Sequence, residues 1–373
     1  MKKLIVALPL LAALFISCSE ISGPVEQTVS LDEKIGQMLL IGFRGLTVSD
    51  NDRIAMNIKN GMIGGVVLYD RDVALQSDIR NIQSPEQVRL LISSLQSRAK
   101  IPLLVAIDQE GGKVNRLKEK YGFPPTVSQQ YLGDLNNNDS TKFYADRTAV
   151  TLKNLGINLN FAPVVDVNIN PQSPAIGAIG RSFSANPQTV ASDAGIVINS
   201  FHQKNIFATL KHFPGHGSAA SDSHYGFTDV TSTWQQIELD PYRSLINNGF
   251  ADFVMTAHIF NANLDPEYPA TLSKKIMTGI LREQLGFKGA IITDDMGMGA
   301  ITSQFGLETA VEKSLDAGVD ILLFANNLTY DENIASKVIA IIKSLIAEGK
   351  ISTERIDDSY NRIMKLKRSL RLY

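Results

Sequence analysis

The sequence has very little cysteine: Cys18 is the only one among 373 residues. A lone cysteine excludes a disulfide within the chain, so the fold depends on its hydrophobic core, for which 44% hydrophobic residues are ample. An excess of either charge is also lacking, since 36 basic and 38 acidic residues leave a net charge of −2. Without a basic stripe the chain has no electrostatic footprint for nucleic acid, and we expect no nucleic-acid partner.

The apolar stretch near the N-terminus, Leu4–Ile16, is too short to span a bilayer. It follows Lys2 and Lys3 and ends just before Cys18. This order resembles a bacterial lipoprotein signal, in which the chain is cleaved before a cysteine that then carries lipid. We therefore predict a signal peptide over 1–17, a tether over 18–29 and a folded domain over 30–373, with lipid on Cys18 anchoring the protein to a membrane of the cell envelope, periplasmic or outer. The alternative is an ordinary secretory signal that happens to contain a cysteine.

Short runs rich in Val, Ile and Leu alternate with longer amphipathic stretches from Ser30 onward. The runs are almost continuously apolar, which is typical of strands buried on both faces of a parallel sheet. We predict eight strands, at Met38–Phe43, Gly65–Tyr69, Leu103–Ile107, Asn158–Phe161, Ile206–Leu210, Phe253–Thr256, Gly289–Thr293 and Ile321–Phe324.

The stretches between these runs carry helix start and stop signals. Ser or Asn followed by Pro opens two of the stretches, and a glycine follows the end of five of them. The predicted helices are Ser84–Arg98, Lys142–Leu155, Asn186–Lys204, Thr233–Asn248, Ser273–Leu285, Thr309–Ala317, Glu332–Glu348 and Ser352–Leu370. The alternation predicts an α/β fold, a TIM-type (β/α)8 barrel in a single domain, although the length alone would also fit two domains.

Chemically active side chains follow the predicted strands at their C-terminal ends, where such a barrel places its active site. They are Asp108 after the third strand, Asp166 after the fourth, Lys211 and His212 after the fifth, His258 after the sixth, and Asp294 and Asp295 after the seventh. Each alone could be an ordinary surface residue. Their convergence from different strands is what a catalytic face requires.

Residues 211–224 hold three of the five histidines of the chain, on a loop that a proline and two glycines keep from being a regular helix. His224 can give and take a proton near neutral pH, and Asp222 can orient it and stabilise its cation. His216 is expected to brace the turn. His202 lies within a predicted helix and is expected to be structural.

Asp294 ends an apolar run, so its carboxylate is rigidly aimed and partly desolvated, as a nucleophile or general base requires. Asp295 is expected to cap the following segment. Asp108 can accept two hydrogen bonds from sugar hydroxyls, and a Gly-Gly turn can fold Arg116 back over the same pocket. Arg181 can bind a carboxylate or an amide carbonyl. The candidates for holding a polyhydroxy ligand are therefore Asp108, Arg116, Arg181, Lys211, His212 and His258.

Together these segments resemble glycoside hydrolase family 3, specifically its single-domain β-N-acetylglucosaminidase branch. The matching segments are Ala106–Arg116 (AIDQEGGKVNR), Gly180–Phe183 (GRSF), Lys211–Gly217 (KHFPGHG) with Asp222, Ser223 and His224, Met255–His258 (MTAH) and Thr293–Met298 (TDDMGM). The histidine-rich segment separates this branch from the β-glucosidases of the family, which take their acid/base from another domain. The resemblance covers about residues 30–370 and implies the barrel fold.

The resemblance also implies a retaining mechanism, in which Asp294 is the nucleophile and His224, paired with Asp222, is the acid/base. It implies that a terminal N-acetylglucosamine is held by Asp108, Arg116, Arg181, Lys211 and His212, and it implies no cofactor and no metal. We expect a monomer that acts on N-acetylglucosamine-containing oligosaccharides from peptidoglycan, chitin-type or other glycans.

Four alternatives stay open. The first is a β-N-acetylglucosaminide phosphorylase, because the neutral imidazole of a histidine acid/base does not repel an incoming phosphate anion. The second is a β-glucosidase of the same family. A metal-dependent barrel hydrolase would use His212, His216, His224 and Asp294 as ligands. A non-catalytic sugar-binding lipoprotein would keep Asp108 and Arg116 without an acid/base. Two features depart from the family: Lys113 replaces the common Arg, and the lipoprotein signal differs from the cytoplasmic members, which points to a role in the envelope.

Overall fold

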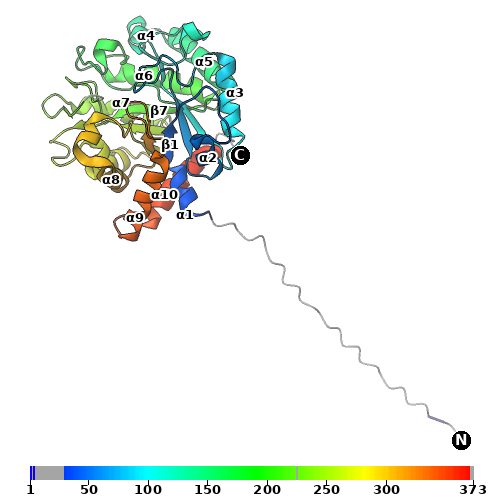
Figure 1. Cartoon of the computed structure of the whole chain (residues 1–373). Coiled ribbons are helices and arrows are strands. Elements are labelled where there is room, and N and C mark those ends of the chain that lie inside the picture. The colour runs from blue at the N-terminus through cyan, green and yellow to red at the C-terminus, as the bar shows by residue number, and fades with distance from the viewer. Residues whose placement is uncertain (2, 5–28, 224–225, 370–373) are drawn as a thin grey trace.

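The computed structural model describes residues 1, 3–4, 29–223 and 226–369. Its centre is one sheet of eight parallel strands that curls into a barrel with helices around it (Figure 1). The strands, in chain order, are β1 (Leu39–Gly42), β2 (Gly65–Leu68), β3 (Leu104–Ile107), β6 (Leu159–Asn160), β7 (Phe207–Phe213), β9 (Phe253–Thr256), β11 (Ala290–Ile292) and β12 (Leu322–Phe324). Each lies within or overlaps one of the eight predicted strands, so the barrel prediction is confirmed.

Neighbouring strands in the sheet are also neighbours in the chain, from β1 to β12. The first strand, β1, pairs in parallel with both β2 and β12. The remaining gap between β11 and β12 is crossed by a parallel bridge between Ile292 and Ile321, and the Thr293 N–H donates to the Ile321 carbonyl at 3.0 Å. The barrel is therefore nearly closed, and the C-terminal ends of all eight strands meet on one face.

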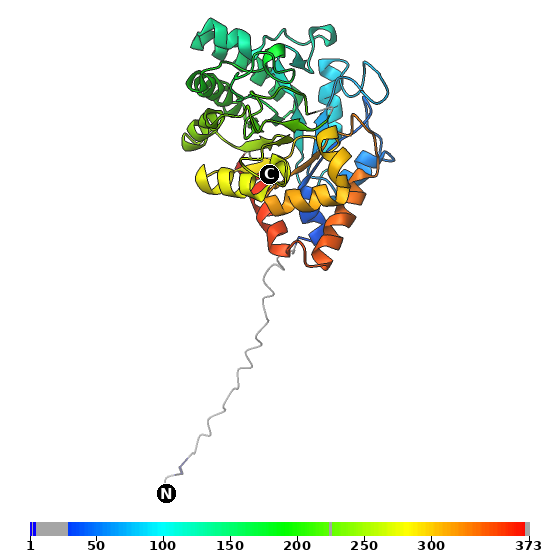
Figure 2. The same ribbon diagram turned by 90° about the vertical axis from the view of Figure 1, so that its left-hand side faces the viewer.

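Helices surround the barrel in both views (Figures 1 and 2). They are α1 (Leu31–Gln37), α2 (Arg53–Lys59), α3 (Pro85–Gln96), α4 (Gln129–Leu135), α5 (Asn138–Leu155), α6 (Pro187–His202), α7 (Asp240–Asn247), the π-helical η5 (Lys275–Gln284), α8 (Gly299–Ala317), α9 (Ile334–Ala347) and α10 (Thr353–Ser369). Their inner faces and the strands form one continuous hydrophobic core.

The capping signals act as predicted. The Ser84 side chain accepts a hydrogen bond from the Gln87 N–H at the start of α3, and Asn186 does the same for two N–H groups of α6. Gly156 and Gly318 end α5 and α8 in the left-handed conformation. Helices α1, α2 and α4 were not predicted from the sequence, because each is seven residues long and too short to show a clear helical period.

Helix α8 differs most from its prediction, because it begins at Gly299 rather than Thr309. The backbone leaves helical geometry at Gly306, where φ is +67°. A glycine with this conformation kinks the helix, and the kink splits the apolar pattern from which the prediction was made.

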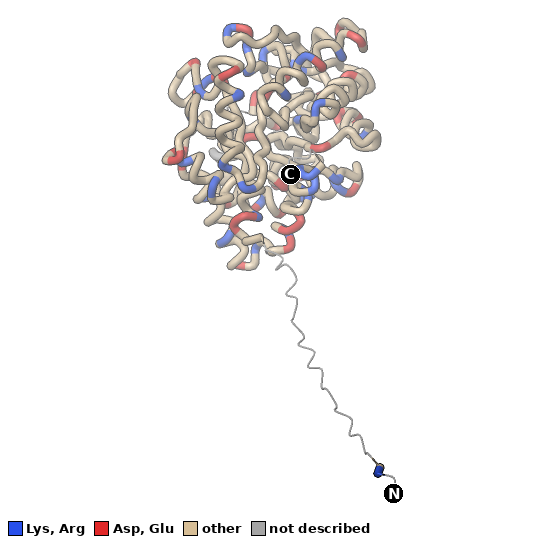
Figure 3. The backbone as a smooth tube through the Cα atoms, turned by 90° about the vertical axis from the view of Figure 1, so that its right-hand side faces the viewer, with Lys and Arg blue, Asp and Glu red and all other residues tan. Residues whose placement is uncertain are grey.

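The chain enters the barrel through α1, which contacts α9 and α10 and leads directly into the start of β1 (Figure 1). The predicted signal peptide, tether and lipid site at Cys18 lie almost wholly outside the described residues. None of the helices in the described part of the chain is long and apolar enough to cross a membrane. Basic and acidic residues are interspersed along the chain (Figure 3), as the balanced composition predicts.

The last helix, α10, closes the barrel at the end opposite its C-terminal face. Lys367 is fully buried there, and its Nζ donates to Gln37 Oε1 at 2.6 Å and to the carbonyls of Gly64 and Pro102 at 2.8 and 2.7 Å. Burial lowers the pKa of this ammonium to about 7. The three acceptors match the three donors of an ammonium group, so the lysine ties α10 to the segments that precede β1, β2 and β3.

Candidate active site

A cavity of about 400 Å³ lies at the C-terminal ends of the strands, within the size range of small-molecule sites. Loops that follow different strands bring their side chains to it. Of the predicted site residues, those that line this cavity are Asp108, Arg116, Arg181, Lys211, His212, Asp222 and Asp294. The structure therefore gathers into one cavity residues that lie up to 186 positions apart in the chain (from 108 to 294).

The segment after β3 folds back as an antiparallel hairpin of β4 (Gln109–Gly111) and β5 (Val114–Asn115). Its turn needs glycine, because Gly111 has a φ of +97° and a Cβ there would lie 2.2 Å from the Val127 carbonyl oxygen. The hairpin places Arg116 Nη2 3.4 Å from Asp108 Oδ2, which is the fold-back geometry that the Gly-Gly turn predicts. Nε of Arg116 is buried and has no hydrogen-bond partner among the described residues.

Glu110 pairs with two cations of the cavity wall, Arg181 and Lys211, and its side chain is only 1% exposed. Its two oxygens accept from Arg181 Nε and Nη2 at 2.9 and 2.7 Å, and Lys211 Nζ lies 2.6 Å from Oε1. Lys211 also donates to Asp108 Oδ1 at 2.8 Å. Two carboxylates and two cations therefore share one buried cluster.

The cations of this cluster keep its two carboxylates ionised. Burial alone would raise the pKa of the Glu110 carboxyl, but Arg181 and Lys211 overcome it and lower the pKa to about 2. Burial opposes ionisation of Asp108 in the same way, and Lys211 and Arg116 hold the pKa of that carboxyl far below its usual value. Both groups are therefore anions at neutral pH and act only as hydrogen-bond acceptors.

His212 is held by Asp166, a fully buried residue of the loop after β6. Its Nδ1 lies 2.7 Å from Asp166 Oδ2, and its Nε2 lies 3.1 Å from Arg181 Nη2. Burial, with the nearby cations of Arg181 and Lys211, lowers the pKa of this imidazole well below its usual value. A neutral ring with the proton on Nδ1 satisfies both contacts. With both nitrogens engaged, the geometry does not favour His212 as a metal ligand.

Asp294 follows β11 at the cavity wall, and its Oδ1 accepts a hydrogen bond from the Asp295 N–H at 2.8 Å. Asp295 has a different task. Its Oδ1 accepts from the N–H groups of Gly297 and Ala325 at 3.0 and 2.8 Å, so it caps the turn before α8 and ties it to the loop after β12. Both residues line the cavity, and the Asp295 carboxylate also binds the backbone of the turn, which agrees with the capping role predicted for it.

Asp222 lines the cavity from the loop that follows β7. His224, its predicted partner, lies outside the described residues. His216, on the same loop, is buried, and its Nε2 lies 3.1 Å from Ser223 Oγ. The prediction that His216 braces the loop therefore agrees with its position.

His258, which was predicted to bind the sugar, is not among the residues that line the cavity, so the structure does not bring it together with the other predicted sugar-binding residues. The residue is 1% exposed, its Nδ1 lies 2.7 Å from Thr271 Oγ1, and its Nε2 lies 3.0 Å from the Asp295 carbonyl. These contacts brace the turn after Asp294 from behind. His202, expected to be structural, lies on α6 with its Nε2 2.6 Å from Asp252 Oδ2, away from the site.

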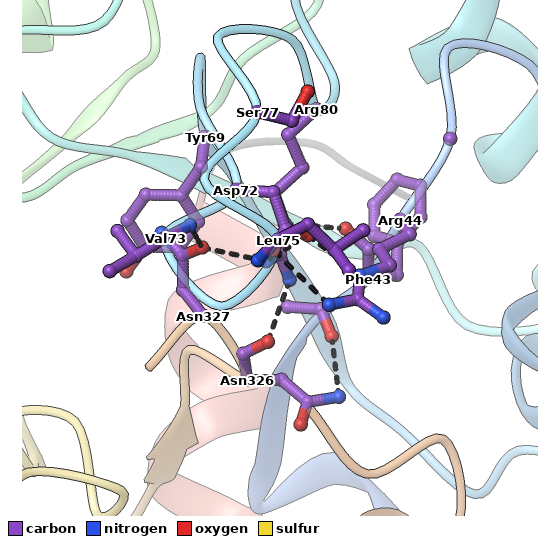
Figure 4. A network of polar contacts seen from close by, with 12 residues as sticks. Phe43, Arg44, Tyr69, Asp72, Val73, Leu75, Ser77, Arg80, Asn326 and Asn327 are labelled. Carbon is purple, nitrogen blue, oxygen red and sulfur yellow. Dashed lines mark hydrogen bonds and ion pairs between the residues drawn. The ribbon is translucent and has the colours of Figure 1, made fainter. Parts of the chain in front are cut away.

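A buried polar network supports the part of the cavity wall that is formed by the loops after β2 and β12 (Figure 4). At its centre the Arg80 side chain is fully buried, and its guanidinium lies 3.1 Å from Asp72 Oδ2 and donates to Asn327 Oδ1 at 2.8 Å. It also donates to the carbonyls of Phe43 and Asn326 at 2.9 and 3.0 Å. Arg80 thus joins the loops after β1, β2 and β12, and the latter two carry cavity-lining residues.

Sequence analysis missed the roles of Glu110, Asp166 and Arg80. Asp166 follows a predicted strand, but nothing in the sequence indicates that it binds the turn around His212. Glu110 lies two residues after Asp108 in an acidic strand end, a signal that could have marked it. Arg80 lies in a long loop with no local pattern.

Residues 30–366 match the N-terminal domain of glycosyl hydrolase family 3. A "Beta-hexosaminidase A" of Pseudoalteromonas piscicida is 32% identical over 382 residues, which cover 92% of this chain and 62% of the relative.

Two solved structures have the same fold. A family 3 β-N-acetylglucosaminidase from Paenibacillus sp. str. FPU-7 has a TM-score of 0.83 at 33% identity, over 92% of this chain and 63% of that one. A β-N-acetylhexosaminidase from Beutenbergia cavernae has a TM-score of 0.78 at 28% identity, over 91% of this chain and 98% of that one. The chain thus spans less than two thirds of the Pseudoalteromonas and Paenibacillus proteins and nearly all of the Beutenbergia protein. Because the family domain matches residues 30–366, the chain belongs to glycoside hydrolase family 3.

Proposed function

We propose that this protein is a retaining exo-β-N-acetylglucosaminidase, which removes terminal β-linked N-acetylglucosamine from peptidoglycan fragments or chitin-type and other glycans. One observation carries the proposal: Asp294 and Asp222 line the same cavity as Asp108 and Lys211, which form an ion pair with each other. The relatives named β-hexosaminidase and β-N-acetylglucosaminidase support the same activity.

The buried cluster is suited to hold a polyhydroxy ring. The anionic Asp108 accepts hydrogen bonds from sugar hydroxyls, while Lys211 and Arg116 donate to hydroxyl oxygens. Arg181 and His212 complete the sugar site. The unpartnered Nε of Arg116 is a buried donor beside the cavity, and a sugar oxygen would satisfy it.

Asp294 acts as the nucleophile. Its carboxylate attacks the anomeric carbon, a bond forms between that carbon and the aspartate oxygen, and the glycosidic bond breaks. The hydrogen bond from the Asp295 N–H to Oδ1 helps to fix the orientation of the attacking carboxylate.

The pair of Asp222 and His224 moves the proton. In the first step His224 donates a proton to the departing glycosidic oxygen, and Asp222 stabilises the imidazolium from which the proton leaves. In the second step His224 takes a proton from water, which attacks the anomeric carbon and releases Asp294. Two displacements at one carbon return the product with the β configuration of the substrate.

We propose further that the enzyme is a monomer of one catalytic domain over 30–373, held in the bacterial cell envelope by lipid on Cys18. The order of basic, apolar and cysteine residues at the N-terminus supports this anchor. The balanced surface charge supports no nucleic-acid partner.

The test is the hydrolysis of 4-nitrophenyl β-N-acetylglucosaminide and of N-acetylglucosamine disaccharides, with and without phosphate. The wild type is expected to release N-acetylglucosamine first as the β anomer, seen by NMR, and Asp294→Ala to lose about 10⁴-fold in turnover or more. The exposed Asp134→Asn is the control and should match the wild type. Release of the α anomer, of a sugar phosphate as the main product, or full activity of Asp294→Ala would contradict the proposal.

A further inference from the structure

Ser223 lies directly between Asp222 and His224 in the chain, yet its side chain faces the protein interior. The residue is only 2% exposed, and its Oγ lies 3.1 Å from Nε2 of His216. Asp222, the residue before it, lines the cavity. Adjacent residues of this loop therefore face opposite sides, one toward the site and one toward the barrel.

His216 is itself firmly held. It is 3% exposed, and its backbone N–H donates to Asp166 Oδ1 at 2.8 Å. The same carboxylate accepts the His212 N–H at 3.1 Å, so it binds both ends of the turn from 212 to 216. The next residue, Gly217, donates its N–H to Glu238 Oε2 at 3.0 Å. Two buried carboxylates thus fix the backbone that carries the His216 ring.

Burial lowers the pKa of the His216 imidazole, so the ring is neutral and only one of its nitrogens carries a proton. Nδ1 of the ring is buried without a hydrogen-bond partner in the described part of the chain. An unpaired N–H is costlier to bury than an unpaired lone pair, so the proton resides on Nε2 and is donated to Ser223 Oγ. Among the described residues, the ring therefore makes one side-chain hydrogen bond, to Ser223 on the loop of Asp222.

We propose that Ser223 and His216 are positioning residues for proton transfer. Their hydrogen bond anchors the loop to the barrel wall, and thereby sets where Asp222 and the acid/base that follows Ser223 lie relative to Asp294. This inference rests on the proposed function. A proton donor must lie within hydrogen-bond distance of the glycosidic oxygen, and a misplacement of about 1 Å costs up to about 100-fold in rate.

The test uses Ser223→Ala, His216→Phe and the double variant on two substrates. One is an N-acetylglucosamine disaccharide, whose leaving group needs the proton. The other is an activated aryl N-acetylglucosaminide, whose leaving group does not. Each single variant is expected to lose about 10- to 100-fold in kcat/KM, which reports the first chemical step, on the disaccharide and less than about threefold on the aryl substrate.

The double variant should lose no more activity on the disaccharide than the more impaired single variant, because both changes break the same hydrogen bond. Ser221→Ala is the matched control, since Ser221 lies on the same loop but is exposed and bonds Thr228 at 3.1 Å. It should behave as the wild type. His216→Gln, which keeps a polar group near the position of Nε2, should recover most of the rate. Losses that multiply in the double variant, or that are equal on both substrates, would overturn the inference.

A second measurement does not depend on activity. Amide hydrogen exchange of the segment 218–228 should speed up in Ser223→Ala and His216→Phe, and remain as in the wild type in Ser221→Ala. Unchanged exchange in the first two variants would overturn the inference even if the enzyme cleaves both substrates. A wild type that cleaves neither substrate would instead refute the proposed function, and exchange alone would then decide whether the anchor exists.

Discussion

Replacing Glu110 with glutamine removes one negative charge from the site and leaves the shape of the side chain almost unchanged. The buried carboxylate of the wild type lies against Arg181 and Lys211, at 2.7 and 2.6 Å. The variant leaves these two cations with less compensation inside the protein. Breaking a buried ion pair in this way costs about 3–5 kcal/mol.

The pKa of Glu110 gives an independent magnitude. It falls from 4.5 to about 2 in the folded protein, and that interval corresponds to about 3 kcal/mol of stability. Because the folded pKa is the lower one, this contribution is fully present above pH 4.5 and is lost as the pH falls toward 2. The difference between wild type and Glu110→Gln should therefore be about 3 kcal/mol at pH 7 and shrink progressively below pH 4.5.

Urea unfolding followed by circular dichroism at pH 7, 5, 4 and 3 measures this difference. Glu119→Gln, at an exposed position shortly after the hairpin, is the matched control and should change the free energy of unfolding by less than about 0.5 kcal/mol. The same Glu110 variant should raise KM for an aryl N-acetylglucosaminide, because Arg181 and Lys211 lose their fixed positions. A loss below about 1 kcal/mol at pH 7, or a loss that stays constant down to pH 3, would refute the reasoning.

Three other changes test separate parts of the structure. Arg80→Met should lower the free energy of unfolding by about 3–5 kcal/mol, since it removes one of the two arginines that pair with the buried Asp72 and takes the donor away from the buried carbonyls of Phe43 and Asn326 (Figure 4). The exposed Arg243→Met should cost less than about 1 kcal/mol, and equal losses of the two variants in urea unfolding would contradict this account. The free energy of unfolding of the wild type should rise between pH 7 and 10, because the buried Lys367 ammonium loses its proton at a lower pH than the same group in the unfolded chain. Lys367→Met should abolish this rise. Free energies of unfolding that change with pH in the same way in both proteins would contradict the prediction. His224→Ala should lower kcat/KM, which reports the first chemical step, far more for a disaccharide than for an activated aryl substrate, and equal losses in kcat/KM would remove it as the acid.

The barrel could be predicted from the sequence because its strands are buried on both faces. A strand such as β2 or β3 then reads as an uninterrupted apolar run, and a capped amphipathic helix follows most of them. The short helices α1 and α4 were not predicted, because two turns contain too few residues to show the apolar repeat of a helix. Only the second part of α8 was predicted, because Gly306 interrupts its helical geometry.

The candidate site was predictable wherever a reactive residue ends a strand, as Asp108 and Asp294 do. The hairpin that returns Arg116 was predictable too, because two adjacent glycines permit that turn. His258 shows the limit of this reasoning: it also follows a strand, but its side chain turns behind Asp295. Which way a side chain turns depends on packing partners distant in the chain, and no local pattern records them.

The same limit hid the residues that hold the site together. Glu110 and Asp166 look like ordinary strand-end carboxylates in the sequence. Their roles appear only when the barrel brings Arg181 and His212 to them from other loops. Long-range ion pairs of this kind are a property of the closed barrel rather than of any segment.

The central claim is that Asp294 forms a covalent bond with the sugar. Brief treatment with 5-fluoro-N-acetylglucosaminyl fluoride, which forms a glycosyl-enzyme quickly and releases it slowly, followed by proteolysis and mass spectrometry, tests it most directly. We predict one added fluorosugar per protein, on the peptide that contains Asp294, and none in Asp294→Ala. A label on another carboxylate, or turnover of the substrate with no covalent adduct at any time, would contradict the account.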